Sequence, residues 1–118
     1  MKAVIIQKFG DLEGSSLKTG IDIPRPSEHE VLIKVKAAGV NRPDILQRKG
    51  LYKVPSDASP IMGLEVAGEI VEAGENVTKT KIGTQVCALV PGGGYAQYVL
   101  TNEAHCFPIP KGISMVEA

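Results

Sequence analysis

Tryptophan is absent from this sequence, and only three tyrosines and two phenylalanines occur among its 118 residues. A folded core must therefore be built mainly from Val, Ile, Leu and Ala. Neither sign of charge is in excess, because 13 Lys and Arg residues balance 13 Asp and Glu residues. A chain without net charge produces no general field that attracts nucleic acid or an anionic lipid surface, so we expect neither as a partner.

Long apolar runs are also missing. The N-terminal run from Ala3 to Ile6 is too short for the core of a signal peptide, and no stretch approaches the length that spans a bilayer. The only two cysteines, Cys87 and Cys106, are most simply free, buried thiols in a reducing compartment. We therefore expect a cytoplasmic protein without membrane association.

The 13 glycines and eight prolines that are present indicate many turns, which suit short strands. In EVLIKVKAAGV, apolar residues from Val31 to Ala37 alternate with Lys34 and Lys36, which indicates a half-buried strand. Further strands are expected at Met1–Gln7 and Leu17–Ile23 and in the segments LEVAGEIVEAG, TQVCALV and GGGYAQYVL, and CFPIP is expected to be extended. Without a βαβ alternation, residues 1–118 predict one mainly β domain, a barrel or sandwich with a few short helices.

Two segments carry the signature of a helix start. In NRPDILQRKG, Asn41 can cap, Pro43 fits a first turn and Gly50 can close the C-terminus, which predicts two helical turns. Ser114, followed three positions later by Glu117, forms a capping-box pattern at the very end of the chain. We expect this second pattern to introduce a helix that the chain itself does not contain.

The run PGGGYAQY invites interpretation as a nucleotide-binding glycine loop, but two features argue against it. Gln97 stands where the third glycine of that fingerprint belongs, and the alternation from Ala96 to Leu100 predicts a strand. A phosphate-binding glycine loop needs the N-terminus of a helix after it, whose free N–H groups meet the phosphate. The glycines are better interpreted as a loop or hairpin.

No pattern of metal ligands emerges either. His105 and Cys106 are adjacent, but in an extended segment successive side chains point to opposite faces and cannot hold one ion. The other candidates, Cys87 and His29, have no partner at the spacing of a metal site. We expect no metal site.

Four segments occur in the order and spacing of a known family, namely AAGVNRPDILQRKGLY, ASPIMGLEVAGEIVEAG, VCALVPGGGYAQYV and PIPKGIS. Together they resemble the N-terminal half of zinc-independent quinone oxidoreductases, the zeta-crystallin-like branch of the medium-chain dehydrogenase/reductase superfamily. Within it, the likeness is greatest to the tumour-suppressor-inducible quinone reductase type. The resemblance implies a GroES-like fold, a partly open barrel of the alcohol dehydrogenase N-terminal type. It also implies an oxidoreductase that passes hydride from NADPH to a quinone or enone.

The resemblance further implies that both zinc sites of the metal-dependent relatives are missing. Those relatives carry a cysteine ligand in a GxCGTD segment and a histidine ligand in a GHE segment, where this chain has Asn41 and Leu64. The lobe that holds structural zinc is absent too, because Val90 runs directly into the glycine turn. Glu65 is expected to be a structural carboxylate that remains from a zinc-binding ancestor.

By the same resemblance, Asn41 lies near the nicotinamide of NADPH and Tyr52 lines the quinone pocket, so both are candidate catalytic residues. Asn41, Arg42 and Leu64 are the candidate cofactor-binding residues. Simpler alternatives stay open: Asn41 can be only the helix cap and Tyr52 only a loop anchor. Arg42 and Arg48 can form ion pairs or meet the cofactor.

Relatives are longer and continue into a nucleotide-binding Rossmann half. We therefore expect this chain to be a truncated or dissected substrate domain that binds no cofactor by itself and is inactive alone. It would join a nucleotide-binding domain in trans or self-associate through uncovered apolar surface. One alternative is a stand-alone GroES-like binding or interaction module. A co-chaperonin-like ring subunit is less favoured, because no flexible polar docking loop occurs between the first strands.

Overall fold

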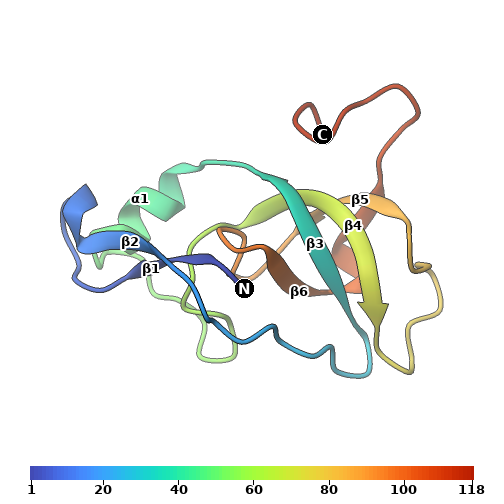
Figure 1. Ribbon diagram of the computed structural model, residues 1–118, viewed down its shortest axis with the longest axis horizontal. Coiled ribbons are helices and arrows are strands. Elements are labelled where there is room, and N and C mark those ends of the chain that lie inside the picture. The colour runs from blue at the N-terminus through green and yellow to red at the C-terminus, as the bar shows by residue number, and fades with distance from the viewer.

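The computed structural model describes all residues from 1 to 118. Two sheets and one α-helix make up the fold (Figure 1). In chain order the elements are β1 (Ala3–Ile6), the 3-10 turn η1 (Leu12–Gly14), β2 (Ser15–Lys18), β3 (Glu30–Ala38), α1 (Arg42–Arg48), β4 (Glu65–Ala73), β5 (Gln85–Leu89), β6 (Tyr98–Asn102), the 3-10 turn η2 (Glu103–His105) and β7 (Cys106–Pro108).

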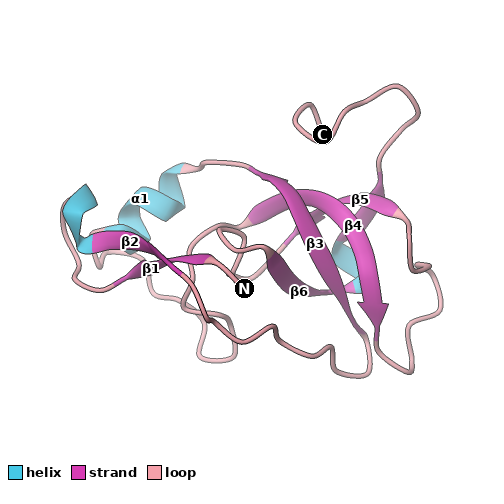
Figure 2. Ribbon diagram, viewed as in Figure 1, coloured by secondary structure: helices cyan, strands magenta, loops and turns pink.

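The larger sheet has five antiparallel strands in the order β6-β3-β4-β5-β7. The register of β3 against β4 shifts between Leu32 and Ile33 and again between Val35 and Ala37. Such irregularities bend a strand and increase its twist, and the sheet is strongly curved (Figure 2). Its edge strands β6 and β7 do not pair with each other. The expected mainly β, partly open barrel is confirmed.

Aliphatic side chains alone form the buried cluster inside the larger sheet. Its members are Val31, Ile33, Val66, Ile70, Val86, Ala88, Val90 and Val99. Full burial of one such side chain contributes about 1.5–3 kcal/mol relative to exposure. The cluster contains no aromatic residue, as the composition predicted. Its residues come mainly from β3, β4, β5 and β6, so their packing holds the curved sheet together.

The central strands β3 and β4 approach each other too closely for a side chain at position 68. A Cβ on Gly68 would lie 2.3 Å from the carbonyl oxygen of Lys34 and 2.7 Å from Cγ2 of Ile33. Any larger residue would force these strands apart. Glycine in a strand interior often marks such a close approach.

The smaller sheet, β1 with β2, lies beside α1 and the glycine loop (Figure 1). The Val4 backbone N–H donates to the carbonyl oxygen of Tyr95 at 2.9 Å, and Gly10 N–H donates to the carbonyl oxygen of Arg48 at 2.9 Å. These bonds connect the N-terminal strands to the glycine loop and to the end of α1. They position the helix relative to the larger sheet.

One expected strand lies elsewhere than the sequence predicted. β2 covers Ser15–Lys18 rather than Leu17–Ile23, because Gly20 has a φ of +75°. That left-handed conformation ends an extended strand, and glycine adopts it without strain. β6 begins at Tyr98, after the glycine run. The expectation that a strand and not a helix follows these glycines is confirmed.

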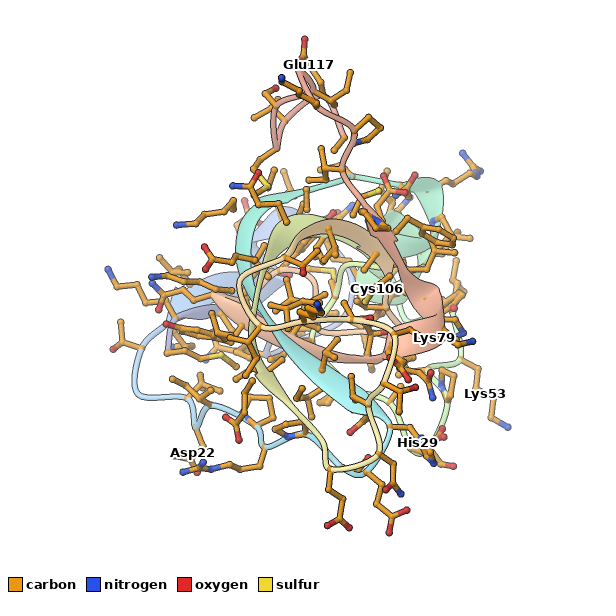
Figure 3. The ribbon with its side chains drawn as sticks, turned by 90° about the vertical axis from the view of Figure 1, so that its right-hand side faces the viewer. Asp22, His29, Lys53, Lys79, Cys106 and Glu117 are labelled. Carbon is orange, nitrogen blue, oxygen red and sulfur yellow. The ribbon has the colours of Figure 1, made fainter.

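The C-terminal capping box forms over a single turn. Ser114 N–H donates to Oε2 of Glu117 at 2.9 Å, and Glu117 N–H donates to Oγ of Ser114 at 3.3 Å. Glu117 lies at the tip of the terminal segment, away from the body of the molecule (Figure 3). Among the helices, none has the length and apolar character that crossing a membrane requires.

Glu103 holds the loop between β4 and β5 against η2. Its carboxylate accepts from the backbone N–H groups of Thr78 at 3.2 Å and Lys79 at 2.8 Å, and from the Thr80 hydroxyl at 3.5 Å. The bond from Lys79 is the main cause that lowers the pKa of Glu103 below its usual value of 4.5. Hydrogen bonds to the charged form stabilise that form.

We predict that Glu103→Gln destabilises the protein at neutral pH and not in acid. A lowered folded-state pKa gives stabilisation that is present above about pH 4.5 and lost as the pH falls through the folded-state value. Urea unfolding of both proteins at several pH values measures this. Glu75→Gln, at an exposed acid with no hydrogen bond, is the control and should change little. A stability difference that stays constant from pH 7 to pH 3 would contradict the prediction.

Candidate functional site

The candidate site lies at the N-terminus of α1, where the chain leaves β3. Asn41 is the N-cap, with extended backbone angles of φ −126° and ψ 159°, and a proline stands in the first turn. The Asn41 backbone N–H donates to Oδ2 of Asp44 at 2.8 Å, as part of a capping box. The expected helix is confirmed, and Asn41 stands at its N-cap position. The cap fixes where Asn41 stands relative to the sheet.

Asp44 also joins the helix to a distant part of the chain. Its exposed fraction is only 3%. The same Oδ2 accepts from the Tyr95 hydroxyl at 2.8 Å, whereas Oδ1 is buried without a hydrogen-bond partner. A hydrogen bond to a charged group contributes about 1.5–3 kcal/mol. The Asp44–Tyr95 bond therefore holds α1 against the segment that follows the glycine run.

The environment of Tyr95 keeps its hydroxyl protonated. Burial raises the pKa of Tyr95 well above the usual value of 10.0. The hydrogen bond to Asp44 and the charges of Asp44 and Glu65 raise this pKa further, because each disfavours a phenolate. Tyr95 is thus a neutral donor throughout the physiological range. Its hydrogen bond to Asp44 positions α1.

Two glycines bring Glu65 and Tyr95 against the backbone here. A Cβ on Gly39 would lie 1.9 Å from Oε1 of Glu65. Gly63 has a φ of +98°, and its Cβ would lie 2.7 Å from Cδ1 of Tyr95. The Gly39 N–H donates to the carbonyl oxygen of Glu65 at 3.1 Å. The helix cap, Glu65 and Tyr95 are therefore gathered at one end of the β3–β4 pair.

The remaining predicted site residues lie at other points around α1 and β4. Tyr52 is half-buried on the loop after α1, and no hydrogen bond joins it to Asn41. Leu64 is half-buried immediately before β4, where its carbonyl oxygen accepts from Val90 N–H at 2.9 Å. Arg42 is exposed and forms no ion pair. Neither Arg42 nor Arg48 forms an ion pair within this chain.

An apolar groove of about 340 Å³ begins at this site. It extends over the ends of β3, β4 and β5, and the C-terminal segment borders it with Met115 and Val116. Glu65 is the only charged residue that lines it. Its walls remain open to solvent, since Leu89 and Phe107 are 56% and 53% exposed. The groove suits an apolar occupant.

The chain contains no group of three or more His, Cys, Asp or Glu side chains that could hold a metal ion. His105 ends η2 and is exposed, whereas Cys106 begins β7 and packs against the aliphatic cluster. Burial raises the pKa of Cys106 to about 11. Both cysteines are free, as expected, but they are only partly buried.

Sequence reasoning missed Asp44 and Tyr95 as members of this site. A signal for Asp44 was present, since it occupies the third helical position, where a capping box places an acid. Tyr95 offered no such signal. Its partner is 51 residues away in the sequence, and only the packing of the glycine run against Gly63 brings them together.

We predict that Tyr95→Phe lowers the free energy of unfolding by about 1–2 kcal/mol, because the buried Asp44 carboxylate loses a donor and water replaces it only in part. Tyr98→Phe is the control: its hydroxyl makes no hydrogen bond, so the change should stay within about 0.5 kcal/mol. Since the folded-state pKa of Tyr95 is raised, the difference should be full below pH 10 and shrink above it. Equal stability of Tyr95→Phe and the parent chain in urea would show that the Asp44–Tyr95 hydrogen bond does not stabilise the fold.

Comparison with known proteins identifies the fold. The family model described as the alcohol dehydrogenase GroES-like domain matches residues 27–111. The quinone oxidoreductase of Lama guanicoe is 38% identical over 111 residues, which are 93% of this chain and 34% of that protein. The Homo sapiens quinone oxidoreductase is 36% identical over 112 residues, 94% of this chain and 34% of that protein. The chain spans about a third of the length of these relatives.

Solved structures agree with this result. The Escherichia coli quinone oxidoreductase complexed with NADPH superimposes with a TM-score of 0.87 at 26% identity, over 98% of this chain and 35% of that one. The human synaptic vesicle membrane protein VAT-1 homolog-like protein gives a TM-score of 0.89 at 31% identity, over 98% and 37%. The chain therefore belongs to the alcohol dehydrogenase GroES-like domain family and has the quinone oxidoreductase-like form of that domain.

Proposed function

We propose that this chain is the substrate-side domain of an NADPH-dependent quinone or enone oxidoreductase that transfers hydride without zinc. The observation that carries the proposal is similarity to quinone oxidoreductases along 93% of the chain. The candidate site adds support. It offers the side-chain amide of Asn41 and the phenol of Tyr52, which can form hydrogen bonds with a neutral acceptor molecule.

The side chains at the site support the proposal of zinc-independent chemistry. Asn41 and Leu64 offer an amide and an alkyl group, whereas zinc sites in proteins use Cys, His, Asp or Glu. A metal serves alcohol oxidation by stabilising an alkoxide. A quinone already accepts hydride readily, so the acceptor needs orientation more than it needs a Lewis acid.

The glycine loop of this chain does not fit the phosphates of a dinucleotide. A Cβ on Gly92 would lie 2.4 Å from the carbonyl oxygen of Ser59, and one on Gly94 would lie 2.9 Å from the carbonyl carbon of Gly63. The glycine loop is thus filled by the protein's own backbone, and β6 follows it in place of a helix. We propose that a nucleotide-binding domain outside this chain holds NADPH, which supplies the hydride.

Within this chain, Asn41 and Tyr52 would contact the quinone and the nicotinamide. The Asn41 side-chain amide can both donate and accept hydrogen bonds. The bonds that Asp44 accepts from the Asn41 backbone N–H and the Tyr95 hydroxyl hold the backbone at this position. The Tyr52 hydroxyl makes no hydrogen bond within the chain, so it can donate to a quinone oxygen, and its ring can stack on the acceptor. Arg42, exposed at the same helix start, would meet the cofactor.

The apolar groove gives the nucleotide-binding domain a place to pack. Gly39 and Glu65 line both the groove and the candidate site, so a domain seated in the groove would also face Asn41. Val116 at its border is 85% exposed. Exposed apolar surface of this kind marks an interaction site. When that domain is absent, we propose that two copies of the chain associate through the groove.

We predict that duroquinone perturbs backbone amide NMR signals around Asn41 and Tyr52 in the full chain. Duroquinone is fully substituted, so the two free thiols cannot add to it. Tyr52→Phe should weaken binding by roughly 2–10-fold through loss of one hydrogen bond, and Tyr98→Phe should not. p-Xylene, which lacks the carbonyl groups, should bind more weakly. Equal binding of both compounds would instead favour a general aromatic-binding module.

We also predict that the chain binds NADPH more weakly than the micromolar range, as isothermal titration calorimetry can show. Most of the binding energy for a dinucleotide comes from the phosphate-binding turn of a Rossmann domain. Micromolar affinity of the isolated chain would contradict the division of roles proposed above. Urea unfolding with and without NADPH provides an independent check, because a tight ligand raises stability.

A further inference from the structure

A second cavity, of about 500 Å³, lies away from the candidate site. Three segments that are distant in the sequence enclose it: the N-terminus with the segment after β2, the end of the loop before β4, and the glycine run with β6. Its apolar walls include Ile5, Ile21, Ile61, Val99 and Leu100. Cavities of a few hundred cubic ångströms are the usual size of small-molecule sites.

Backbone hydrogen bonds hold these walls in place without a ligand. Ile21 N–H donates to the carbonyl oxygen of Met1 at 3.1 Å, and Gly93 N–H donates to the carbonyl oxygen of Ile61 at 2.7 Å. Ile61 N–H donates in turn to Oγ of Ser59 at 3.3 Å. Since each segment is bonded to a neighbour, the cavity is preformed, which lowers the entropic cost of binding.

The charged groups that line this cavity are mostly acidic. Asp22, Glu30 and Asp57 contribute carboxylates, and no Lys, Arg or His side chain lines it. The one positive group is the Met1 amino group, which donates to the carbonyl oxygen of Ile21. Oε2 of Glu30 accepts from the backbone and hydroxyl groups of a neighbouring serine.

Asp22 and Asp57 have no such partners. Both are exposed and form no hydrogen bond or ion pair through their side chains. Asp22 lies at the surface on the segment after β2 (Figure 3). An apolar cavity with free carboxylates among its lining attracts positive charge and repels negative charge.

We propose that this cavity binds a small organic cation, an ammonium group carried on an aromatic or aliphatic body. The apolar walls would bury the body, and Asp22 and Asp57 would attract the ammonium group. A bare metal ion does not fit, because no three of the acidic, histidine or cysteine side chains come together to coordinate one. The site also differs from the candidate site in its ligand, since a quinone is neutral and a dinucleotide is anionic.

Three probes of the same shape and different charge test the proposal: 3-phenylpropylammonium, 3-phenylpropan-1-ol and 3-phenylpropionate. Each is titrated into the ¹⁵N-labelled full chain at pH 7 and low salt. The ammonium compound should bind best and shift the amide signals of Ile21, Ser59 and Gly93, the alcohol should bind more weakly and the carboxylate weakest. Equal affinities for all three, or shifts confined to other parts of the chain, would overturn the proposal.

A double variant, Asp22→Asn with Asp57→Asn, isolates the contribution of charge. Both side chains are exposed, so the fold should be retained. We expect the ammonium affinity to fall roughly threefold to thirtyfold, as for two partly exposed ion pairs, and the alcohol affinity to stay the same. Asp11→Asn, at another exposed acid, should change neither. Salt should weaken only the binding of the ammonium compound. Unchanged ammonium binding by the double variant would disprove the assignment.

Discussion

The pairing of β3 with β4 is the constraint on which the rest of this fold depends. These nine-residue strands form the centre of the larger sheet, and their closest approach leaves no space for a side chain at Gly68. Ile33 and Ile70, one from each strand, are completely buried. The candidate site is attached to one end of this pair, because Gly39 follows β3 and Glu65 begins β4. Any change that separated the two strands would also move the helix cap away from Glu65.

The buried polar groups at that end of the strand pair, Asp44 and Tyr95, hold the helix start in place. Asp44 uses one oxygen for both the Asn41 N–H and the Tyr95 hydroxyl, and the raised pKa of Tyr95 keeps it a hydrogen-bond donor. A carboxylate with such partners orients its neighbours. The function proposed above requires reactants held in a fixed orientation, for which a rigid site is needed. The second cavity differs in character, since its free carboxylates select for positive charge.

Sequence reasoning succeeded where the signal was local. The alternation from Val31 to Ala37 predicted β3, and the residues from Asn41 to Gly50 predicted α1, because strand alternation and helix capping depend on near neighbours. The strand after the glycine run was predicted for the same reason. The expected strand from Leu17 to Ile23 was misplaced. Its apolar residues resembled a strand, but Gly20 adopts a left-handed conformation that ends the pairing earlier.

The sequence by itself therefore determined the fold class, the family and the helix cap at Asn41. It did so because those features depend on residues that are close together in the sequence or on motifs of fixed spacing. Only the tertiary structure decided that Tyr95 would join Asp44, that an apolar groove would open beside Glu65, and that Asp22 and Asp57 would line one cavity. Each of these depends on contacts between residues far apart in the chain. Such contacts follow from strand register and from the close packing that glycines allow, and no short stretch of sequence encodes them.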